Sequence, residues 1–257
     1  KIDLKNKTAL VTGAGKGLGK ACAIALAEAG AKVIIISRTL SDLIKVEKLI
    51  RKTKGSCLKF ECDITDVNSF KAILNKIKRL DILVNNAGNN RPEHFTQVKK
   101  ENMEYLVELN MKAAFNVAQI CSQKMVELKA RKKVGGSIIN IGSILGRNAF
   151  PATLGYCASK AAVDQMTKVM AIEWARYGIR VNCIAPGYIR TELIEQLAVD
   201  GKVKLEDLEK RTPQRRLGTG DDIANAVRYV ASEGAAFMTG ETLVVDGGWT
   251  AFGYYQT

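Results

Sequence analysis

The stretch TALVTGAGKGLG, residues 8–19, decides the fold of this chain. Its first five residues form a short apolar run with β-branched members, which is typical of a buried strand. The four glycines that follow let the backbone turn sharply, because glycine has no Cβ atom. A helical period then begins at Leu18 and continues to Ala29, and Gly30 ends it. These residues predict a strand, a glycine turn and a helix in direct succession.

The rest of the chain repeats this alternation of short β-branched runs and longer amphipathic segments. It predicts one α/β domain over residues 1–257, a Rossmann fold with seven parallel strands and helices on both faces of a doubly wound sheet. The expected strands are residues 8–12, 33–37, 58–61, 82–85, 137–141, 180–184 and 243–245. The expected helices are residues 18–29, 40–52, 67–78, 101–129, 154–177 and 222–231. The polar segment 190–217 interrupts the pattern, and we expect it to form a lid over a binding cleft.

The composition excludes several classes of protein. Apolar residues make up 47% and charged residues 25% of the 257-residue chain, which is typical of a globular protein. The apolar stretches fall well short of the roughly 20 residues that cross a bilayer, and no secretory signal is visible. Six scattered cysteines without a CxxC spacing, and a single histidine, favour reduced thiols, a cytoplasmic location and no metal site.

The net charge of +13 is the unusual number. Such an excess of positive charge can favour binding to nucleic acid, to an anionic membrane or to a small acidic ligand. Because the basic residues are spread along the chain, we expect a small anionic ligand, with no nucleic acid and no membrane.

The glycine turn matches neither of two common phosphate-binding patterns. A Walker loop, GxxxxGK followed by Ser or Thr, fails because the chain has Ala14 and Ala21 where Gly and a hydroxyl are needed. A GxGxxG fingerprint fails because its last glycine would fall on Leu18 or Lys20. The pattern that fits is TGxxxGxG, and a tight connection without a ligand is the plain alternative. At the first strand–helix junction, however, the turn favours a dinucleotide diphosphate. Its expected ligands are Gly13, Gly15, Lys16, Gly17, Leu18 and Gly19.

The end of the second strand bears on the choice of dinucleotide. Sites for NAD usually place Asp or Glu there, whereas this chain has Ser37 and Arg38. Arg38, together with Lys16, can pair with a 2′-phosphate, so we expect NADP(H) to be preferred and NAD(H) to remain possible. The alternative for Arg38 is a solvated surface side chain. After the third strand, Asp63 and Ile64 are expected beside the adenine. Asn86, Ala87 and Gly88 are expected along the cofactor path.

Six motifs occur in one order along the chain: TGAGKGLG (12–19), NNAG (85–88), Asn110, Ser143, YxxxK (Tyr156 and Lys160) and PGYIRT (186–191). Together they resemble the short-chain dehydrogenase/reductase family over essentially the whole chain. The resemblance implies that Asn110, Ser143, Tyr156 and Lys160 are catalytic, with Asn110 bending its helix and holding a water next to Lys160. It also implies a homotetramer that packs through helices 101–129 and 154–177. The further cofactor contacts that it implies are Pro186, Gly187, Ile189 and Thr191.

The YxxxK pair can be argued from its chemistry, although this spacing alone more often marks an exposed helix face. Residues four apart share one face of a helix, so the tips of Tyr156 and Lys160 can meet. An ammonium about 4 Å away at an effective dielectric near 20 contributes about 4 kcal/mol, or roughly three pKa units. We therefore expect the pKa of Tyr156 to fall to near 7, where proton transfer is most effective. Lys160 would also bind the nicotinamide ribose, and Ser143 would orient the substrate oxygen.

Within the family, the chain is similar to sugar-acid and polyol dehydrogenases of the gluconate 5-dehydrogenase and 2-deoxygluconate dehydrogenase type. The phrases that carry this are NNAGNNRPEHF (85–95), EWARYGIRVNCIAPGYIRTEL (173–193), KRTPQRRLG (210–218) and VDGGWTA (245–251). Arg91 follows the NNAG motif and Arg147 follows Ser143, so both are candidates to bind a substrate carboxylate. The alternative is that both are charged surface side chains. The substrate would then be a small carbonyl or alcohol compound, either neutral or anionic.

Two other functions stay open. The first is a 3-oxoacyl-(acyl-carrier-protein) reductase, with Lys129, Arg131 and Lys132 near an acidic carrier. The second is a dinucleotide sensor without catalysis, although the complete set of four catalytic residues argues against it. The tail 249–257, with Phe252, Tyr254 and Tyr255, either covers a neighbouring subunit's site or closes the edge of the core.

Overall fold

The computed structural model describes residues 2–132, 135–201 and 203–253, and in them seven strands form one parallel sheet. The strand order is β3-β2-β1-β4-β5-β6-β7, which confirms the doubly wound sheet. The order reverses between β1 and β4, so a crevice is expected at the carboxyl ends of these two strands. The strands are β1 (Thr8–Thr12), β2 (Lys32–Ser37), β3 (Ser56–Glu61), β4 (Ile82–Asn85), β5 (Gly136–Ile141), β6 (Ile179–Pro186) and β7 (Thr242–Val245).

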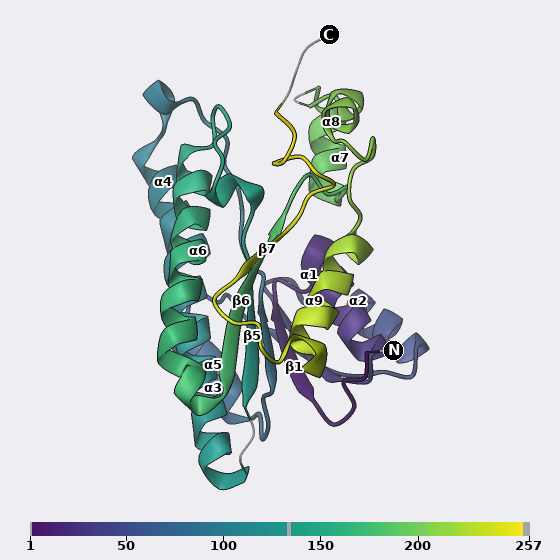
Figure 1. Cartoon of the computed structure of the whole chain (residues 1–257), viewed down its shortest axis with the longest axis vertical. Helices are drawn as coiled ribbons and strands as arrows, with labels where there is room; N and C mark the ends of the chain where they lie inside the picture. Colours follow the sequence, from purple (N-terminus) through teal and green to yellow (C-terminus); the bar gives the residue numbers. More distant parts are fainter. Residues whose placement is uncertain (1, 133–134, 202, 254–257) are drawn as a thin grey trace.

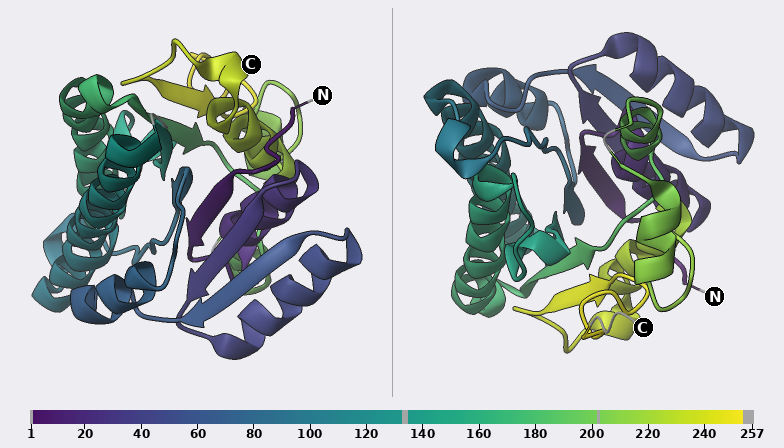
Figure 2. Two further views of the ribbon diagram at one scale, coloured as in Figure 1. Left: turned by 90° about the horizontal axis from the view of Figure 1, so that it is seen from below. Right: turned by 90° about the horizontal axis from the view of Figure 1, so that it is seen from above.

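Helices cover both faces of this sheet (Figures 1 and 2). Helices α1 (Gly17–Glu28), α2 (Leu40–Lys52) and α9 (Gly220–Ala231) lie on one face. Helices α3 (Val67–Asn75), α5 (Ala114–Lys132) and α6 (Leu154–Trp174) lie on the other. The period of two along β2 explains this arrangement, because Val33 and Ile35 join the first core while Ile34 and Ile36 join the second.

The expected helix 101–129 is divided into three parts in the structure. It comprises α4 (Lys100–Leu106), a π-helical segment, η2 (Val107–Ala113), and α5. A π-helix carries one extra residue in a turn and often marks a functional site. Asn110 lies in the middle of this segment, which agrees with its expected role in bending the helix.

The segment 190–217 contains two short helices, α7 (Glu192–Val199) and α8 (Leu205–Arg211). Figure 1 shows both beyond the upper end of the sheet, where β6 leads into α7. Their charged side chains pair locally: Arg190 lies 3.1 Å from Glu209, and Arg216 lies 2.8 Å from Asp222 at the start of α9. The segment therefore lies beyond the carboxyl ends of the strands, and its role as a lid stays a prediction.

Candidate active site

A cleft of ≈ 480 Å³ lies at the carboxyl ends of the strands. It adjoins a smaller pocket of ≈ 300 Å³, with which it shares Gly13, Lys16, Ala87 and Gly88. Most of the expected site residues meet here, although they come from seven separate segments of the chain. The cleft is lined by Gly13, Lys16, Gly17, Leu18, Asn86, Ala87, Gly88, Ser143, Tyr156, Lys160, Pro186, Gly187, Ile189 and Thr191. The smaller pocket adds Gly15, Ser37, Arg38, Asp63 and Ile64.

The glycine turn has the shape that a diphosphate requires. A Cβ atom at Gly19 would lie 2.3 Å from the Gly13 carbonyl oxygen, so this glycine is needed for the packing of the turn itself. Gly17 differs, because its φ is +51° and a Cβ there would meet only Thr191, at 3.9 Å, on the side that faces the cleft. The N-terminus of α1 also has no side-chain cap and no acidic residue in its first turn. Its free N–H groups can therefore bind an anion.

The loop after β4 is held against this turn by side chains. The Thr12 hydroxyl accepts hydrogen bonds of 3.0 Å from the N–H groups of Asn86 and Ala87. The Asn86 amide in turn donates to the Thr12 and Gly13 carbonyls. Thr12 was not expected as a site residue, although its place in TGxxxGxG was a signal for it. The contacts fix the two loops that face each other across the crevice.

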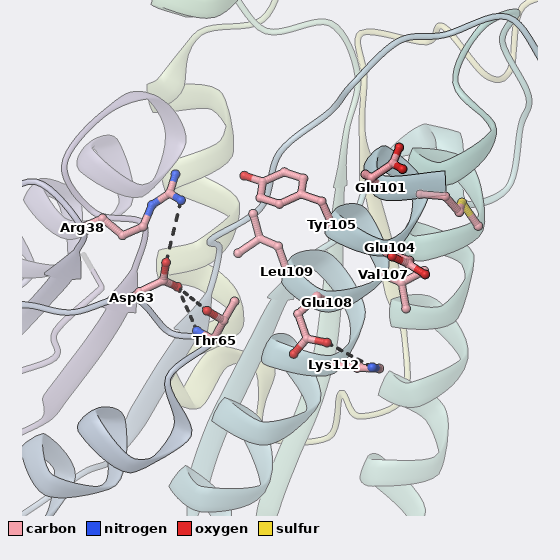
Figure 3. A pocket seen from close by; sticks show the side chains of 11 residues that line it. Arg38, Asp63, Thr65, Glu101, Glu104, Tyr105, Val107, Glu108, Leu109 and Lys112 are labelled. Atoms are coloured by element: carbon pink, nitrogen blue, oxygen red, sulfur yellow. Dashed lines mark hydrogen bonds and ion pairs between the residues drawn. The ribbon is translucent and has the colours of Figure 1, made fainter. Parts of the chain in front are cut away.

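The cationic end of the smaller pocket lies at β2. Arg38 is 59% exposed and lies 3.8 Å from Asp63, which is a loose ion pair, and Lys16 lies 3.4 Å from Asp42 on α2. Asp63 also accepts hydrogen bonds from the backbone and hydroxyl of Thr65. Figure 3 shows that Arg38 and Asp63 face a further hollow of ≈ 780 Å³, whose opposite wall carries Glu101, Glu104 and Glu108. The Arg38 guanidinium is thus at the open rim of the pocket, where it can reach a phosphate.

Asn110 is buried behind the cleft and acts on the loop after β4. Its side-chain oxygen accepts a 2.9 Å hydrogen bond from the Asn89 N–H, and its amide donates 2.8 Å to the Asn89 carbonyl. The same amide also donates to the hydroxyl of Ser159 on α6. These bonds connect the π-helical segment, the loop after β4 and the helix that carries Tyr156. Asn110 is therefore buried in the packing between these segments and is not a surface amide.

Tyr156 and Lys160 share one face of α6, as the four-residue spacing requires. The Lys160 Nζ atom lies 5.6 Å from the centre of the Tyr156 ring and donates a 2.7 Å hydrogen bond to the Ile141 carbonyl at the end of β5. Burial lowers the pKa of Lys160 to about 8. This cation is the only full positive charge that the four catalytic candidates supply.

The expected fall in the pKa of Tyr156 is wrong for the chain itself. Burial raises the pKa of this phenol, and the neighbouring Ser143 only partly offsets the rise. The physical reason is that removing a phenolate from water costs more than its polar neighbour returns. Tyr156 is therefore a protonated phenol at neutral pH.

The structure does not bring Arg91 and Arg147 into the cleft. Arg91 donates a 2.5 Å hydrogen bond to Asn102 and lies over the Tyr105 ring at 3.8 Å, both on α4. Arg147 instead pairs with Asp164 of α6 at 3.1 Å. Sequence order places both arginines near site motifs, but it does not show which carboxylate or ring lies within reach of each side chain.

Aromatic side chains border the cleft around Tyr188, which lies just before the segment 190–217. Tyr188 lines the cleft, and its ring lies 4.6 Å from that of Trp249 and 6.5 Å from that of Phe150. Arg211 of α8 lies 4.7 Å from the Trp249 ring and donates to the Phe252 carbonyl. This part of the tail therefore packs on the chain's own lid. Tyr254 and Tyr255 lie outside the described residues.

Membrane spans and metal centres are two other kinds of site to consider in residues 2–132, 135–201 and 203–253. No helix in that part of the chain is long and apolar enough to span a membrane. The described His, Cys, Asp and Glu side chains include no group of three or more that could hold a metal ion.

A Rossmann-type sheet whose switch-point cleft is lined by a glycine turn, a tyrosine and a lysine is typical of dinucleotide-dependent oxidoreductases. A family model described as enoyl-(acyl carrier protein) reductase matches residues 13–250. The chain belongs to the short-chain dehydrogenase/reductase family.

Individual relatives point in two directions. The chain is 39% identical to 2-dehydro-3-deoxy-D-gluconate 5-dehydrogenase of Bacillus subtilis over 251 residues, which cover 96% of both chains. It is 36% identical to a 3-oxoacyl-(acyl-carrier-protein) reductase of Rickettsia bellii, over 96% of this chain and 98% of that one. The crystal structure of a gluconate 5-dehydrogenase from Burkholderia cenocepacia in complex with NADP and tartrate is similar, with a TM-score of 0.90 at 35% identity and 98% coverage of each chain.

Proposed function

We propose that this chain uses NADP(H) to interconvert a secondary alcohol and a ketone on a sugar acid or polyol, with NAD(H) as a weaker alternative. The glycine turn, the uncapped N-terminus of α1 and the exposed Arg38 support a dinucleotide that carries a 2′-phosphate. The similar gluconate 5-dehydrogenase that was crystallised with NADP supports the same choice. When bound, the dinucleotide would supply or accept the hydride.

Each part of the dinucleotide has candidate ligands in the cleft. The diphosphate would contact Gly13, Gly15, Gly17, Leu18 and Gly19, while Ser37, Arg38 and Lys16 would bind the 2′-phosphate end. The adenine would lie beside Asp63 and Ile64, with Asn86, Ala87 and Gly88 along the path. The nicotinamide end would contact Lys160, Pro186, Gly187, Ile189 and Thr191. Thr191 must share its hydroxyl, because it already caps α7 through the Ile194 N–H at 3.4 Å.

The residues of the chain carry the proton. The Ser143 hydroxyl would bind the carbonyl oxygen of the substrate, and Tyr156 Oη would give its proton to that oxygen as the ketone is reduced. Lys160 would stabilise the phenolate that forms, and Asn110 would hold the loop after β4 and a water next to Lys160. The single observation that carries this assignment is that Ser143, Tyr156 and Lys160 line the same cleft as the glycine turn, with Lys160 Nζ 5.6 Å from the centre of the Tyr156 ring.

The pKa shifts favour the reductive direction near neutral pH. Burial raises the pKa of Tyr156, so the phenol holds a proton that it can donate. Lys160, with a pKa of about 8, is mostly an ammonium at pH 7. Oxidation of the alcohol requires the phenolate, so it should accelerate as the pH rises.

The substrate class rests on the rim of the cleft. Polar side chains of Asn89, Asn90 and Glu192 and the aromatic ring of Tyr188 line it. This mixture suits a ligand with several hydroxyl groups, which can donate and accept hydrogen bonds while its C–H groups contact a ring. Because neither Arg91 nor Arg147 lines the cleft, we propose no carboxylate contact for them, and the keto polyol is as suitable a substrate as the sugar acid.

The acyl-carrier alternative is favoured by the 36% identity to a 3-oxoacyl-(acyl-carrier-protein) reductase. The side chains of Lys129, Arg131 and Lys132, which were expected to meet the carrier, lie outside the described part of the structure. A substrate panel separates the candidates: a 5-ketohexonate, a four-carbon keto polyol and an acetoacetyl thioester, each with NADPH and with NADH. Turnover of the thioester alone would reject the sugar assignment. NADPH binding without any turnover would indicate a sensor.

We further propose a homotetramer in the cytoplasm. Apolar side chains stay exposed on the outer faces of α5 and α6, including Phe115, Val169 and Ile172, and the last of these is 79% exposed. Such side chains on neighbouring helices support burial against other copies of the chain. All six cysteines are free thiols, which supports a reducing compartment. Light scattering of the purified chain measures the assembly, and a monomer at micromolar concentration would reject it.

A further inference from the structure

Beneath the cleft, a buried cluster of polar side chains lies one helical turn beyond Lys160. Asp164 follows Lys160 by four residues on α6, so both side chains lie on one face of the helix. The Asp164 carboxylate is bound on both sides: Arg147 Nε lies 3.1 Å from one oxygen, and the Cys183 thiol of β6 donates 3.3 Å to the other. The Asp164 side chain is only 10% exposed, whereas Arg147 is 45% exposed.

The backbone after β5 packs directly on this cluster. A Cβ atom at Gly142 would lie 2.5 Å from Cys183 Sγ and 3.2 Å from an Asp164 oxygen. One at Gly146 would lie 3.0 Å from the Lys160 carbonyl. The segment that carries Ser143 therefore lies against α6 with no room for further atoms. A charge in this place is shielded poorly by water, so it acts strongly on a neighbouring charge.

The charged groups around Lys160 can be identified element by element. On α6, Tyr156 is a neutral phenol and Asp164 is an anion; on β6, Cys183 stays a thiol, because burial raises its pKa to about 12. From β5 and the segment after it come the Ile141 carbonyl and the Arg147 guanidinium. From the π-helical segment comes the uncharged Asn110 amide. Among these described neighbours, Asp164 and Arg147 carry formal charges, and they form an ion pair with each other.

We propose that Asp164 and Arg147 are positioning residues for Lys160: the Asp164 carboxylate keeps the buried amine protonated, and Arg147 limits how much of that negative charge reaches it. The inference rests on the proposed function, since it assigns the proton held by Lys160 a part in the reaction. Burial lowers the pKa of Lys160, and Cys183 and Asp164 act against this shift. Without Asp164, more of the enzyme would lose the ammonium in the range in which it works.

The two residues must then act in opposite directions, which a merely structural pair would not do. Asp164→Asn removes the negative charge but keeps the shape, so the proton on Lys160 is lost at lower pH. Arg147→Met removes the positive charge and exposes Lys160 to the whole of the Asp164 charge, so the proton is lost at higher pH. A single nearby charge typically shifts such a titration by about one unit or more.

The experiment follows kcat/KM for ketone reduction with saturating NADPH from acid to alkaline pH. We expect the alkaline limb to move to lower pH by about one unit in Asp164→Asn and to higher pH in Arg147→Met. Glu173→Gln is the matched control, because it makes the same change at an exposed position nine residues further along α6, about 13.5 Å away along the axis. Its limb should not move, since salt screens exposed charges beyond about 8–10 Å.

Two further measurements test the proposal if Asp164→Asn does not fold or if no ketone is reduced. Arg147→Lys keeps the positive charge, so the alkaline limb of its kcat/KM profile should stay in place. Comparing Arg147→Lys with Arg147→Met therefore tests the proposal even if Asp164→Asn does not fold. NMR titration of Lys160 Nζ in ¹⁵N-lysine-labelled protein, assigned with Lys160→Arg, gives the same shifts without turnover. If NMR shows them but no ketone is reduced, the proposed function fails and the charge relation stands. Shifts of the same sign in both variants, or rates that fall with no shift, would overturn the inference.

Discussion

Replacing Gly17 by alanine separates cofactor binding from the stability of the glycine turn. The residue has a φ of +51°, and a Cβ there meets only Thr191 at 3.9 Å. The cost to the fold is therefore backbone strain alone, about 1–2 kcal/mol for an L-residue in this region. For a chain of this length, that corresponds to a fall in Tm of roughly 2–8 °C.

The added methyl group has a larger effect on the dinucleotide. Gly17 lines the cleft at the N-terminus of α1, where the diphosphate would approach the backbone most closely. We expect Gly17→Ala to weaken NADPH binding at least about tenfold, equivalent to 1.4 kcal/mol. Isothermal titration calorimetry measures the affinity, and differential scanning calorimetry measures the Tm of the same preparation.

Gly201 provides the control for this experiment. It has a φ of +69° and no atom within 4 Å of its Cβ position, and it lies between α7 and α8 rather than at the turn. Gly201→Ala should therefore lower the Tm by a similar amount and leave the NADPH affinity unchanged. Equal losses of affinity in the two variants, or none in Gly17→Ala, would refute the placement of the diphosphate at the turn.

Three other changes have defined outcomes. Gly19→Ala places a Cβ 2.3 Å from the Gly13 carbonyl oxygen, so the turn must shift and thermal denaturation should show a larger loss of Tm than in Gly17→Ala. Arg38→Glu should lower the ratio of kcat/KM for NADPH to that for NADH by at least about tenfold, because a carboxylate repels the 2′-phosphate. Asp222→Asn removes the charge that pairs with Arg216 and weakens the capping box of α9, at a cost of about 0.5–2 kcal/mol. The hydrogen bond from Arg216 is the main reason that the pKa of Asp222 lies below its ordinary value. Its stabilisation is present at neutral pH and is lost in acid, so urea denaturation should show the wild type and Asp222→Asn converging below about pH 4.

The parts of the fold that depend on local sequence could be predicted well. Residues 8–12 form β1 as expected, and the glycine turn leads into α1, because strand period and glycine positions act over a few residues. The strand expected at 180–184 is longer, Ile179–Pro186, and the one expected at 58–61 begins at Ser56. These added residues are paired with their neighbours in the sheet, which a single segment does not reveal.

The parts of the site that depend on tertiary packing were predicted less well. The partner of Arg147 is Asp164, and no local pattern places the segment after β5 against that turn of α6. The YxxxK spacing predicts a fall in the pKa of Tyr156, because spacing shows a near charge but not the burial of the phenol, which raises that pKa. The four-residue spacing of Lys160 and Asp164 was a signal that could have been used, since it places a carboxylate on the face of the expected catalytic lysine.

Tyr156→Phe tests the central assignment most directly, because it removes only the hydroxyl group that would carry the proton. The measurement is single-turnover consumption of NADPH with a ketone that the wild type reduces, together with the NADPH affinity of the same variant. We predict a loss of rate on the order of 10²- to 10⁴-fold with the affinity retained. A Tyr156→Phe variant that keeps most of the wild-type rate would contradict the role of Tyr156 as the proton donor.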